Sequence, residues 1–547
     1  MNNRNYNIYF NTHTISGIII CAILYVIFFA GSFAFFRNEI AAWQNNTSYK
    51  TYREDHKNVD HLLDSLRGQT NLHGRDITFY MHREETAAYV GLSASNDSIL
   101  NKENLAKVTP EQKTAKKNSR RRGGNDDSKN FTYNFANKKP GDYVQNYDMG
   151  EFLFRLHFLA QLNQVPIRVG IAPFGYLIAG ITAFIFLFAL ITGLLLHWDK
   201  IVSNFFVFRP FSKWKTVWTD MHTALGVIGF PFQFIFAVTG TFLIINSVLA
   251  LPLSKLLYDG DQQKMYQDIG VSAATDFPYT YKPLKKAIAI APFLDLAKHK
   301  WPEADFQRIT IKNYADSNMH VVMELEPHFN KSFAGSGLLS VRAADNKVVA
   351  EKSPVNDASY ADGVRSIIYR LHYGDYGGYP LKMVYFILGV MGCLVIISGI
   401  LIWLVARDKN NVIPRKRKFN FWAANIFTAI CLTMLPVTAL TFIAIKLSPV
   451  VNQDFIYRVY FYSWLLFSLY YIIRRSIRRT NRETLLVGSI LAFFIPLVNG
   501  FMTGNWIWDT FRNGQRDIFV VDFLWLMIGI IGVIAYNKTK KFFETIR

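Results

Sequence analysis

Eight apolar stretches dominate this sequence, and each is close to the ~20 residues that a helix needs to cross a lipid bilayer. They are predicted at 16–36, 171–197, 222–247, 382–406, 421–446, 455–473, 484–503 and 518–536. Helices in the cores of soluble proteins rarely stay apolar on all sides over such lengths. The sequence therefore predicts an α-helical polytopic membrane protein with about eight transmembrane helices.

Basic residues between these stretches predict how the chain is oriented. The connections after the second, fourth and sixth stretches are rich in Lys and Arg, and so is the C-terminal tail. Positively charged loops stay in the cytoplasm, so both termini are expected there. The formal net charge of +20 is therefore mainly a topology signal, and nucleic acid is not an expected partner.

The first stretch is expected to remain in the mature protein. It is too long for the apolar region of a typical cleaved signal peptide and has no clear small-residue cleavage site. The three cysteines, Cys21, Cys393 and Cys431, lie inside the predicted spans without a metal-binding spacing. Neither a disulfide framework nor a cysteine metal site is expected.

The spans divide the chain into membrane and extracytoplasmic segments. Two large segments, 37–170 and 248–381, are expected outside the membrane, each with a small α+β fold. The other divisions are the N-terminal tail and first span 1–36, the second and third spans 171–247, the fourth span 382–406, a basic cytoplasmic loop 407–420, and a C-terminal module of four spans with a basic tail, 421–547.

Hydrophobic periodicity predicts the elements of the outer segments. In the second segment these are a helix at 284–299 and strands at 306–311, 320–325 and 338–341. The first segment repeats the pattern weakly, with a helix at 55–66 and strands at 76–81 and 86–91. The polar, basic stretch 95–145 is predicted to be a mobile loop because it has few apolar residues. It reads as a solvated spacer, with contact to anionic lipid or an anionic substrate as the alternative.

Two histidine motifs each occur twice, in the same order and at nearly the same separation. A His-Thr-x-x-Gly motif opens the first and third spans at His13 and His222, and a Gly-Ser/Thr-Phe triplet follows each at the same distance, at Gly31 and Gly240. An aromatic-Arg-Leu-His-aromatic motif contains His157 and His372. Neutral imidazole is the common axial ligand of haem iron, and ionisable groups inside a membrane are usually functional.

The topology predicts how these four histidines pair. His13 and His222 both begin spans that run outward, whereas His157 and His372 both precede spans that run inward. Each membrane face then has two imidazoles from different helices, as a six-coordinate b-type haem requires. We therefore predict two b-type haems, one held by the inner pair and one by the outer pair. The neighbouring glycines allow a flat macrocycle or a helix backbone to approach closely.

Three further residues are candidates for the same sites. Arg155 and Arg370 each stand two residues before a histidine, and arginine suits bidentate contacts to carboxylates such as haem propionates. The alternative for both is an arginine that extends to the membrane interface. His197, which Trp403 replaces in the repeat, is an alternative ligand on the cytoplasmic side, an interfacial residue or a contact for an electron donor. The histidines of the outer segments are predicted to be surface residues: His56, His61, His73, His82, His299, His320 and His328.

The C-terminal module contains no histidine, and its role is open. Arg458 and Asp522 lie at similar depths in the sixth and eighth predicted spans, and opposite charges at matching depth are expected to pair. The alternative is that both face water in the headgroup layer.

The sequence offers no electron donor of its own. It has no Gly-x-Gly-x-x-Gly after a strand, no phosphate-binding Walker motif, no Cys-x-x-Cys-His and no soluble flavin domain. Electrons would come from a membrane quinol or from a separate reductase.

At these motifs the chain resembles the PepSY-associated transmembrane family, whose members include bacterial inner-membrane siderophore-iron reductases. The resemblance covers about 8–407 and has its clearest PepSY-like part at 283–352. It is carried by the histidine motifs and by Thr192-Gly193-Leu194-Leu195, Ser398-Gly399-Ile400-Leu401, Trp214-Lys215-Thr216 and Asp220-Met221-His222. Where the family often has His-Arg or His-Lys, this chain has His-Thr at its first motif, so no neighbouring basic residue is carried over.

The resemblance implies a haem-binding core of four helices, periplasmic PepSY domains and reduction of ferric siderophores or other ferric chelates at the periplasmic side of the bacterial cytoplasmic membrane. The expected protein is thus a haem-dependent ferric-siderophore reductase, with no catalytic residue identified. A non-enzymatic PepSY membrane module that binds exported peptides or proteases, as a sensor or regulator, is the alternative. A transporter is a weaker third. A reduced-minus-oxidised absorption spectrum separates the first from the others.

Overall fold

The computed structural model describes residues 2–48, 59–80, 87–106, 127–134, 139–165, 167–169, 172–205, 207, 209, 212–268, 277–409 and 411–545. The chain forms two compact units. The membrane unit comprises Met1–Asn46, Tyr147–Gly260 and Tyr369–Arg547, and the sheet unit comprises Thr47–Asn146 and Asp261–Ile368. The sheet unit lies within the two predicted outer segments, 37–170 and 248–381.

Seven helical spans among the described residues are long and apolar enough to cross a membrane. They are Asn3–Ala34, Phe174–His197, Lys215–Ile244, Gly378–Arg407, Pro414–Leu447, Ile477–Thr503 and Arg516–Thr539. The eighth predicted span, 455–473, forms the helix α16 (Gln453–Arg474). It is not among the seven, because Arg458 and several tyrosines lower its hydropathy. The chain is thus a multi-pass membrane protein, and its described residues contain seven such spans, one fewer than predicted.

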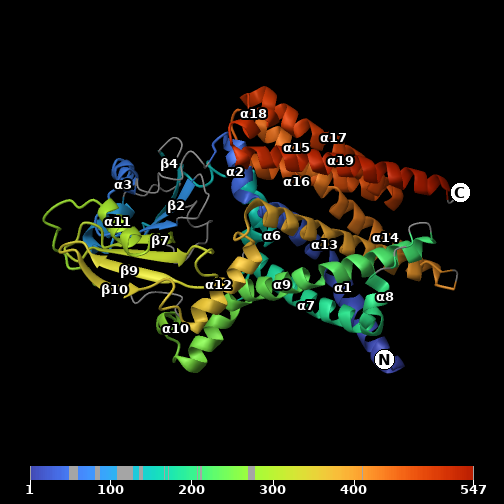
Figure 1. Cartoon of the computed structure of the whole chain (residues 1–547), viewed down its shortest axis with the longest axis horizontal. Coiled ribbons are helices and arrows are strands. Elements are labelled where there is room, and N and C mark those ends of the chain that lie inside the picture. Colours follow the sequence, from blue (N-terminus) through green and yellow to red (C-terminus); the bar gives the residue numbers. More distant parts are fainter. Residues whose placement is uncertain are drawn as a thin grey trace. The chain divides into compact units, whose positions relative to one another are not determined.

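Four helices of the membrane unit pack in a ring, each against two of the others, and Figure 1 labels all four. They are α1 (Asn3–Ala34), α7 (Phe174–His197), α9 (Trp214–Leu257) and α13 (Gly378–Arg407). α1 and α9 each pack against both α7 and α13. Two shorter helices, α6 (Met149–His157) and α12 (Tyr360–Tyr373), carry the second histidine motif, and α6 packs against α1. These six helices position all four repeated histidines.

The C-terminal module packs beside this ring and is tied to it by the short helix α2 (Arg37–Asn45) (Figure 1). Its helices are α14 (Pro414–Leu432), α15 (Met434–Leu447), α16, α17 (Ile477–Thr503), α18 (Ile507–Arg512) and α19 (Arg516–Thr545). α17 packs against α15 and α19, and α2 contacts both α19 and α6. Many buried hydroxyls donate to the carbonyl four residues earlier, which satisfies them inside the bundle. These include Thr428, Thr433, Thr438, Thr441, Thr480, Thr484 and Ser489.

The predicted pairing of Arg458 with Asp522 is wrong. Arg458 is exposed, whereas Asp522 is fully buried and accepts hydrogen bonds from Trp43 Nε1 and Asn499 Nδ2, each at 2.8 Å. The buried cation that acts electrostatically on Asp522 is Lys446, whose ammonium lies 4.3 Å from the centre of the Trp43 ring. Matching depth in two helices does not specify which faces meet, and α2 supplies Asp522 with a partner from another part of the chain.

The sheet unit contains one eight-stranded antiparallel sheet, in the order β10-β9-β8-β7-β1-β2-β3-β4. The first segment contributes β1 (Ile77–Tyr80), β2 (Ala87–Leu92), β3 (Lys129–Asn134) and β4 (Lys139–Gly141). The second contributes β7 (Ala304–Lys312), β8 (His320–Pro327), β9 (Gly337–Arg342) and β10 (Lys347–Lys352). The two segments meet at β1 and β7, where Ile77 pairs with Ile311 and Phe79 with Ile309. Strands that pair lie on one side of a membrane, so both segments are on the same side.

One apolar core joins the two segments. The helices α3 (Val59–Arg67) and α11 (Ala291–Lys300) contribute Leu63, Leu66 and Phe293 to the same buried cluster as the central strands (Figure 1). The predicted helix at 284–299 begins later, at Ala291, where Pro292 occupies the first turn.

Two sequence predictions in the sheet unit are corrected. The segment 95–145, predicted to be a mobile loop, contains α4 (Ser98–Ala106), β3 and β4, while 107–126 lie outside the described residues. β3 was missed because it has few apolar residues, although Tyr133 is buried in the core. His320, predicted to be a surface residue, is 3% exposed and stacks on Phe277 with ring centres 3.7 Å apart. His56 and His82 lie outside the described residues.

Candidate functional site

His13 and His222 form one pair of imidazoles in the four-helix ring. His13 lies on α1 and His222 on α9, and their ring centres are 6.1 Å apart at an interplanar angle of 73°. The structure thus brings together the two histidines that open the repeated spans. We call them the inner pair.

His157 and His372 form a second pair. They lie in the last turns of α6 and α12, with ring centres 5.9 Å apart and an interplanar angle of 42°. Phe236 of α9 stands beside His372, with ring centres 6.2 Å apart. This outer pair is also the one that the sequence repeat predicts.

One ring nitrogen of each histidine is already engaged. Nδ1 lies 2.8 Å from the Ala189 carbonyl in His13, 2.8 Å from the Ile27 carbonyl in His157 and 2.9 Å from the Val395 carbonyl in His222. A carbonyl only accepts, so Nδ1 carries the proton in these three rings. Nε2 is then the nitrogen with a free lone pair.

Thr239 provides the acceptor for the fourth ring, that of His372. Its hydroxyl donates to the Ile235 carbonyl at 2.6 Å and lies 2.8 Å from Nδ1 of His372, from which its oxygen accepts. All four rings therefore have the same tautomer. Histidines that bind metals usually donate their other ring N–H in this way, which fixes the orientation of the ring.

Glycines allow the imidazoles to reach these acceptors. A Cβ at Gly31 would lie 2.5 Å from Nδ1 of His157, and a Cβ at Gly193 would lie 3.0 Å from Cε1 of His13. The corresponding distances are 3.1 Å from Gly399 to Cε1 of His222 and 3.6 Å from Gly240 to Cε1 of His372. The repeated glycine motifs thus mark the points where histidines approach helix backbones.

The glycines one turn after the inner histidines have a different environment. Gly17 and Gly226 stand four residues after His13 and His222, on the same helix faces. Apart from its chain neighbours and the adjoining backbone of its own helix, no described atom lies within 4 Å of a Cβ built at either position. Both helices therefore leave room for a flat group beside the inner imidazoles.

The spacing of each pair suits a shared metal ion. Two metal–nitrogen bonds of ~2.0 Å and ~1.1 Å from each nitrogen to its ring centre would place the centres about 6 Å apart. The described residues contain no group of three or more His, Cys, Asp or Glu side chains that could hold a metal ion. Two protein ligands alone suit a metal whose remaining positions are filled by a macrocycle, such as haem.

The two pairs lie at opposite ends of the ring of helices. The acceptor of His157 is the carbonyl of Ile27, on the same helix as His13. With a rise of 1.5 Å per residue, the stretch from His13 to Ile27 is about 21 Å long. This is a large part of the ~30 Å hydrocarbon core of a bilayer.

Burial keeps the outer imidazoles neutral. It lowers the pKa of His157, and it lowers the pKa of His372 to about 3. Both residues lie outside the membrane-spanning segments. Neutral imidazole is the form that binds metals.

The remaining predicted site residues are placed as follows. Arg155 forms an ion pair with Glu151 on its own helix, and Glu151 also pairs with Arg37 at 2.9 Å. Arg370 is buried in α12, 8% exposed. His197, at the end of α7, is close enough to act electrostatically on both inner histidines.

Sequence reasoning missed the groups that hold the histidines in place. Thr239 lies just before Gly240 of the repeated triplet, so its position was a usable signal. The buried ion pair of Glu39 on α2 with Lys382 on α13, at 2.6 Å, was also missed. The two residues are far apart in the sequence and neither belongs to a repeated motif.

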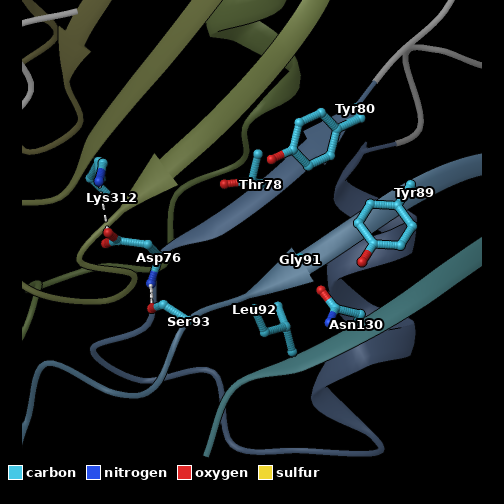
Figure 2. A pocket seen from close by; sticks show the side chains of 9 residues that line it. All are labelled: Asp76, Thr78, Tyr80, Tyr89, Gly91, Leu92, Ser93, Asn130 and Lys312. Atoms are coloured by element: carbon cyan, nitrogen blue, oxygen red, sulfur yellow. Dashed lines mark hydrogen bonds and ion pairs between the residues drawn. The ribbon is translucent and has the colours of Figure 1, made fainter. Parts of the chain in front are cut away.

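The sheet unit has a polar hollow of about 470 Å³ on the face opposite its apolar core (Figure 2). Tyr80 and Tyr89 stand at one end with ring centres 5.7 Å apart, and Lys312 pairs with Asp76 at 2.8 Å at the other. Gly91 lies between them. Thr78, Leu92, Ser93 and Asn130 complete the lining.

The fold and the site define a class of protein. It is a multi-pass helical membrane protein with an extramembrane antiparallel sheet and two facing pairs of histidines. The chain belongs to the family described as PepSY-associated TM region, which matches residues 10–406. The match includes all four histidines and the whole sheet unit and ends before the C-terminal module. A search of curated proteins finds no match.

Proposed function

We propose that this protein is a dihaem electron-transfer protein of the bacterial cytoplasmic membrane, which reduces ferric siderophores or other ferric chelates at the periplasmic side. The inner pair would hold one b-type haem and the outer pair another. Haem supplies an iron that alternates between the ferric and ferrous states. The acceptor would be reduced on the side of the sheet unit, and both termini would be cytoplasmic.

The observation that carries the proposal is the shared geometry of the four histidines. Each ring donates Nδ1–H to a helix acceptor and keeps Nε2 for a metal. Each pair has the spacing expected of two imidazoles that would share one metal ion, and Gly17 and Gly226 leave room for a flat group beside the inner pair. The same arrangement occurs twice, at the two ends of one bundle.

Two sites are needed because of distance. The hydrocarbon core is ~30 Å thick, which is too far for a single fast electron transfer, and a carrier at each end divides it. Arg155 and Arg370 remain candidates for contacts to haem propionates, and His197 remains an alternative ligand or a contact for the donor. The donor itself would be a membrane quinol or a separate reductase.

Haem content and absorption spectra of single variants test the ligand assignment. The His372→Ala variant should lose about half the bound haem and keep the inner one, and His13→Ala should do the reverse. The His299→Ala variant is the matched control, because this residue is exposed on the sheet unit. Full haem content in His372→Ala would refute the pairing, and a colourless wild-type protein expressed with haem available would refute haem binding.

The reaction needs its own test. Protein reduced with dithionite should be reoxidised by a ferric siderophore, and a ferrous chelator present in the mixture should trap the released Fe²⁺. The His157→Ala variant should be slower than wild type, whereas His299→Ala should not. A haem-loaded protein that no ferric chelate reoxidises would falsify the reductase assignment while leaving haem binding intact.

One observation favours the non-enzymatic alternative. β10 is an edge strand of the sheet, and its exposed side chains include Val349. An open edge can accept an extended peptide as an additional strand. A haem-free protein that binds unfolded exported peptides through this edge, and loses them when Val349→Pro is introduced, would support a sensor or regulator instead.

A further inference from the structure

A second cavity lies where the ring of helices joins the C-terminal module. Its volume is about 650 Å³, and it is formed by the end of α13, the connection that follows and the start of α14. Its lining contains three cationic side chains and no acidic one: Arg407, Arg415 and Lys416, with Val412, Phe419 and Asn420. All but Arg407 and Val412 belong to α14, and all lie beyond the family match.

The three cations have no carboxylate partner among the described residues. Arg407 lies over the ring of Trp403, with its guanidinium carbon 5.2 Å from the ring centre, and Arg415 and Lys416 are exposed. The nearby Asp408 is taken by Arg417 at 2.7 Å, and Arg417 does not line the cavity. Positive charge is thus neutralised beside the cavity but not within it.

The start of α14 adds to this excess of positive charge. Its first turn has no acidic residue, and Arg415 and Lys416 stand there. Cations are unfavourable at a helix N-terminus because the helix dipole is positive at that end. A bound anion would offset both the dipole and the like charges.

We propose that this cavity binds a phosphate-bearing anion, held by Arg407, Arg415 and Lys416. Guanidinium groups match the geometry of phosphate oxygens and bind them in a bidentate way. The exposed apolar side chains of Phe419 (69%), which lines the cavity, and Ile413 (60%), which precedes α14, offer contact to a ligand that also has an apolar part. The phosphate can come from the headgroup of an anionic phospholipid or from a soluble phosphate compound such as a flavin nucleotide.

One face of α13 runs from the cavity to the inner pair. Gly399, Trp403 and Arg407 follow each other at intervals of four residues, and Gly399 contacts His222. The distance from Gly399 to Arg407 along the helix is about 12 Å. A ligand here would therefore lie on the same side of the membrane as the inner histidines.

Binding of three probes to the full-length protein tests the proposal. For the lipid, the protein is placed in phosphatidylcholine nanodiscs that contain some phosphatidylglycerol. Native mass spectrometry then measures how much phosphatidylglycerol stays bound to the protein. Binding of flavin mononucleotide and of inorganic phosphate is measured by calorimetry in neutral detergent. The Arg407→Gln/Arg415→Gln variant should bind the relevant probe at least about tenfold more weakly, since charge-assisted bonds to phosphate are lost.

The Lys409→Gln/Lys418→Gln variant is the matched control. It removes the same amount of charge from the connection before α14 and from α14 itself, but neither residue lines the cavity, so it should bind as wild type does. Retention of phosphatidylglycerol alone identifies a lipid site, and binding of either soluble probe identifies a soluble phosphate ligand. Equal losses in both variants, or no binding of any probe by the wild type, would overturn the proposal. The measurement does not depend on haem or on reduction, so its outcome is separate from that of the proposed function.

Discussion

A methyl group at Gly31 should displace His157, whereas the same change at Gly240 should be tolerated. A Cβ at Gly31 would lie 2.5 Å from Nδ1 of His157, about 1 Å closer than two such atoms pack. A shift of that size would lengthen the 2.8 Å hydrogen bond to the Ile27 carbonyl beyond its useful range. At Gly240 the nearest atom of His372 is 3.6 Å from the new Cβ, which is an ordinary contact.

The size of the effect follows from these distances. Loss of a buried hydrogen bond costs about 1 kcal/mol, and overpacking of a close-packed site costs about 1–3 kcal/mol. The sum of about 2–4 kcal/mol corresponds to roughly a 30- to 1,000-fold loss in affinity for a ligand that His157 binds. Gly240→Ala has no such cost, and in a helix it gains up to about 1 kcal/mol.

Both variants should be compared for melting temperature and for haem per polypeptide. We expect Gly31→Ala to melt lower than wild type and to lose the outer haem, with the inner haem retained. Gly240→Ala should match wild type in both measurements. The reasoning is refuted if Gly31→Ala keeps full stability and haem, or if both variants lose them equally. The melting temperature tests the packing argument even if no haem is bound.

Three further predictions follow from buried groups. Asp522→Ala should lower the stability of the membrane unit by about 2–4 kcal/mol in thermal melts, because Trp43 Nε1 and Asn499 Nδ2 lose the buried carboxylate that accepts their hydrogen bonds, and Asp522→Asn, which keeps an acceptor oxygen, should lower it less. Burial raises the pKa of Asp148, which caps the start of α6, to about 6. Between pH 6 and 4 this carboxyl group is therefore protonated in the folded protein but ionised in the unfolded chain. Stability should therefore rise as pH falls through 6, and the difference in melting temperature from Asp148→Asn should show this slope. Phe79→Ala should cost about 3–5 kcal/mol and speed amide exchange in β7 as well as β1, since both segments share one core; exchange confined to β1 would contradict this.

The parts of the fold that the sequence predicts are those encoded locally. Long apolar stretches identify the spans regardless of how they pack, and the repeated motifs around His13 and His222 reveal equivalent positions in two halves. Topology then brings equivalent positions to the same face, which is why the two pairs could be predicted. The sequence pattern indicated that the glycines are sites of close approach. It did not indicate that the group that approaches them is the imidazole itself.

The parts that could not be predicted depend on contacts between distant segments. Ile77 and Ile311 are paired in the sheet but separated in the sequence by two membrane spans. The residue pattern of neither strand indicates that the other is its partner. The partner of Asp522 comes from α2, so matching depths along two helices pointed to the wrong residue. β3 was not predicted because a strand near the edge of a sheet needs only a few apolar residues, such as Tyr133, to join the core.

The position of β1 beside β7 has a consequence for how the protein is made. β1 leaves the ribosome long before β7, and α7 and α9 must enter the membrane between the two. At synthesis rates of about 5–20 residues per second, β1 waits roughly 10 to 45 s for its neighbour. During that interval the first segment carries Ile77 and Phe79 on a strand without its central partner. The chain therefore passes through a stage in which half a sheet is exposed outside the membrane, where a chaperone or a protease can reach it before the second half is made.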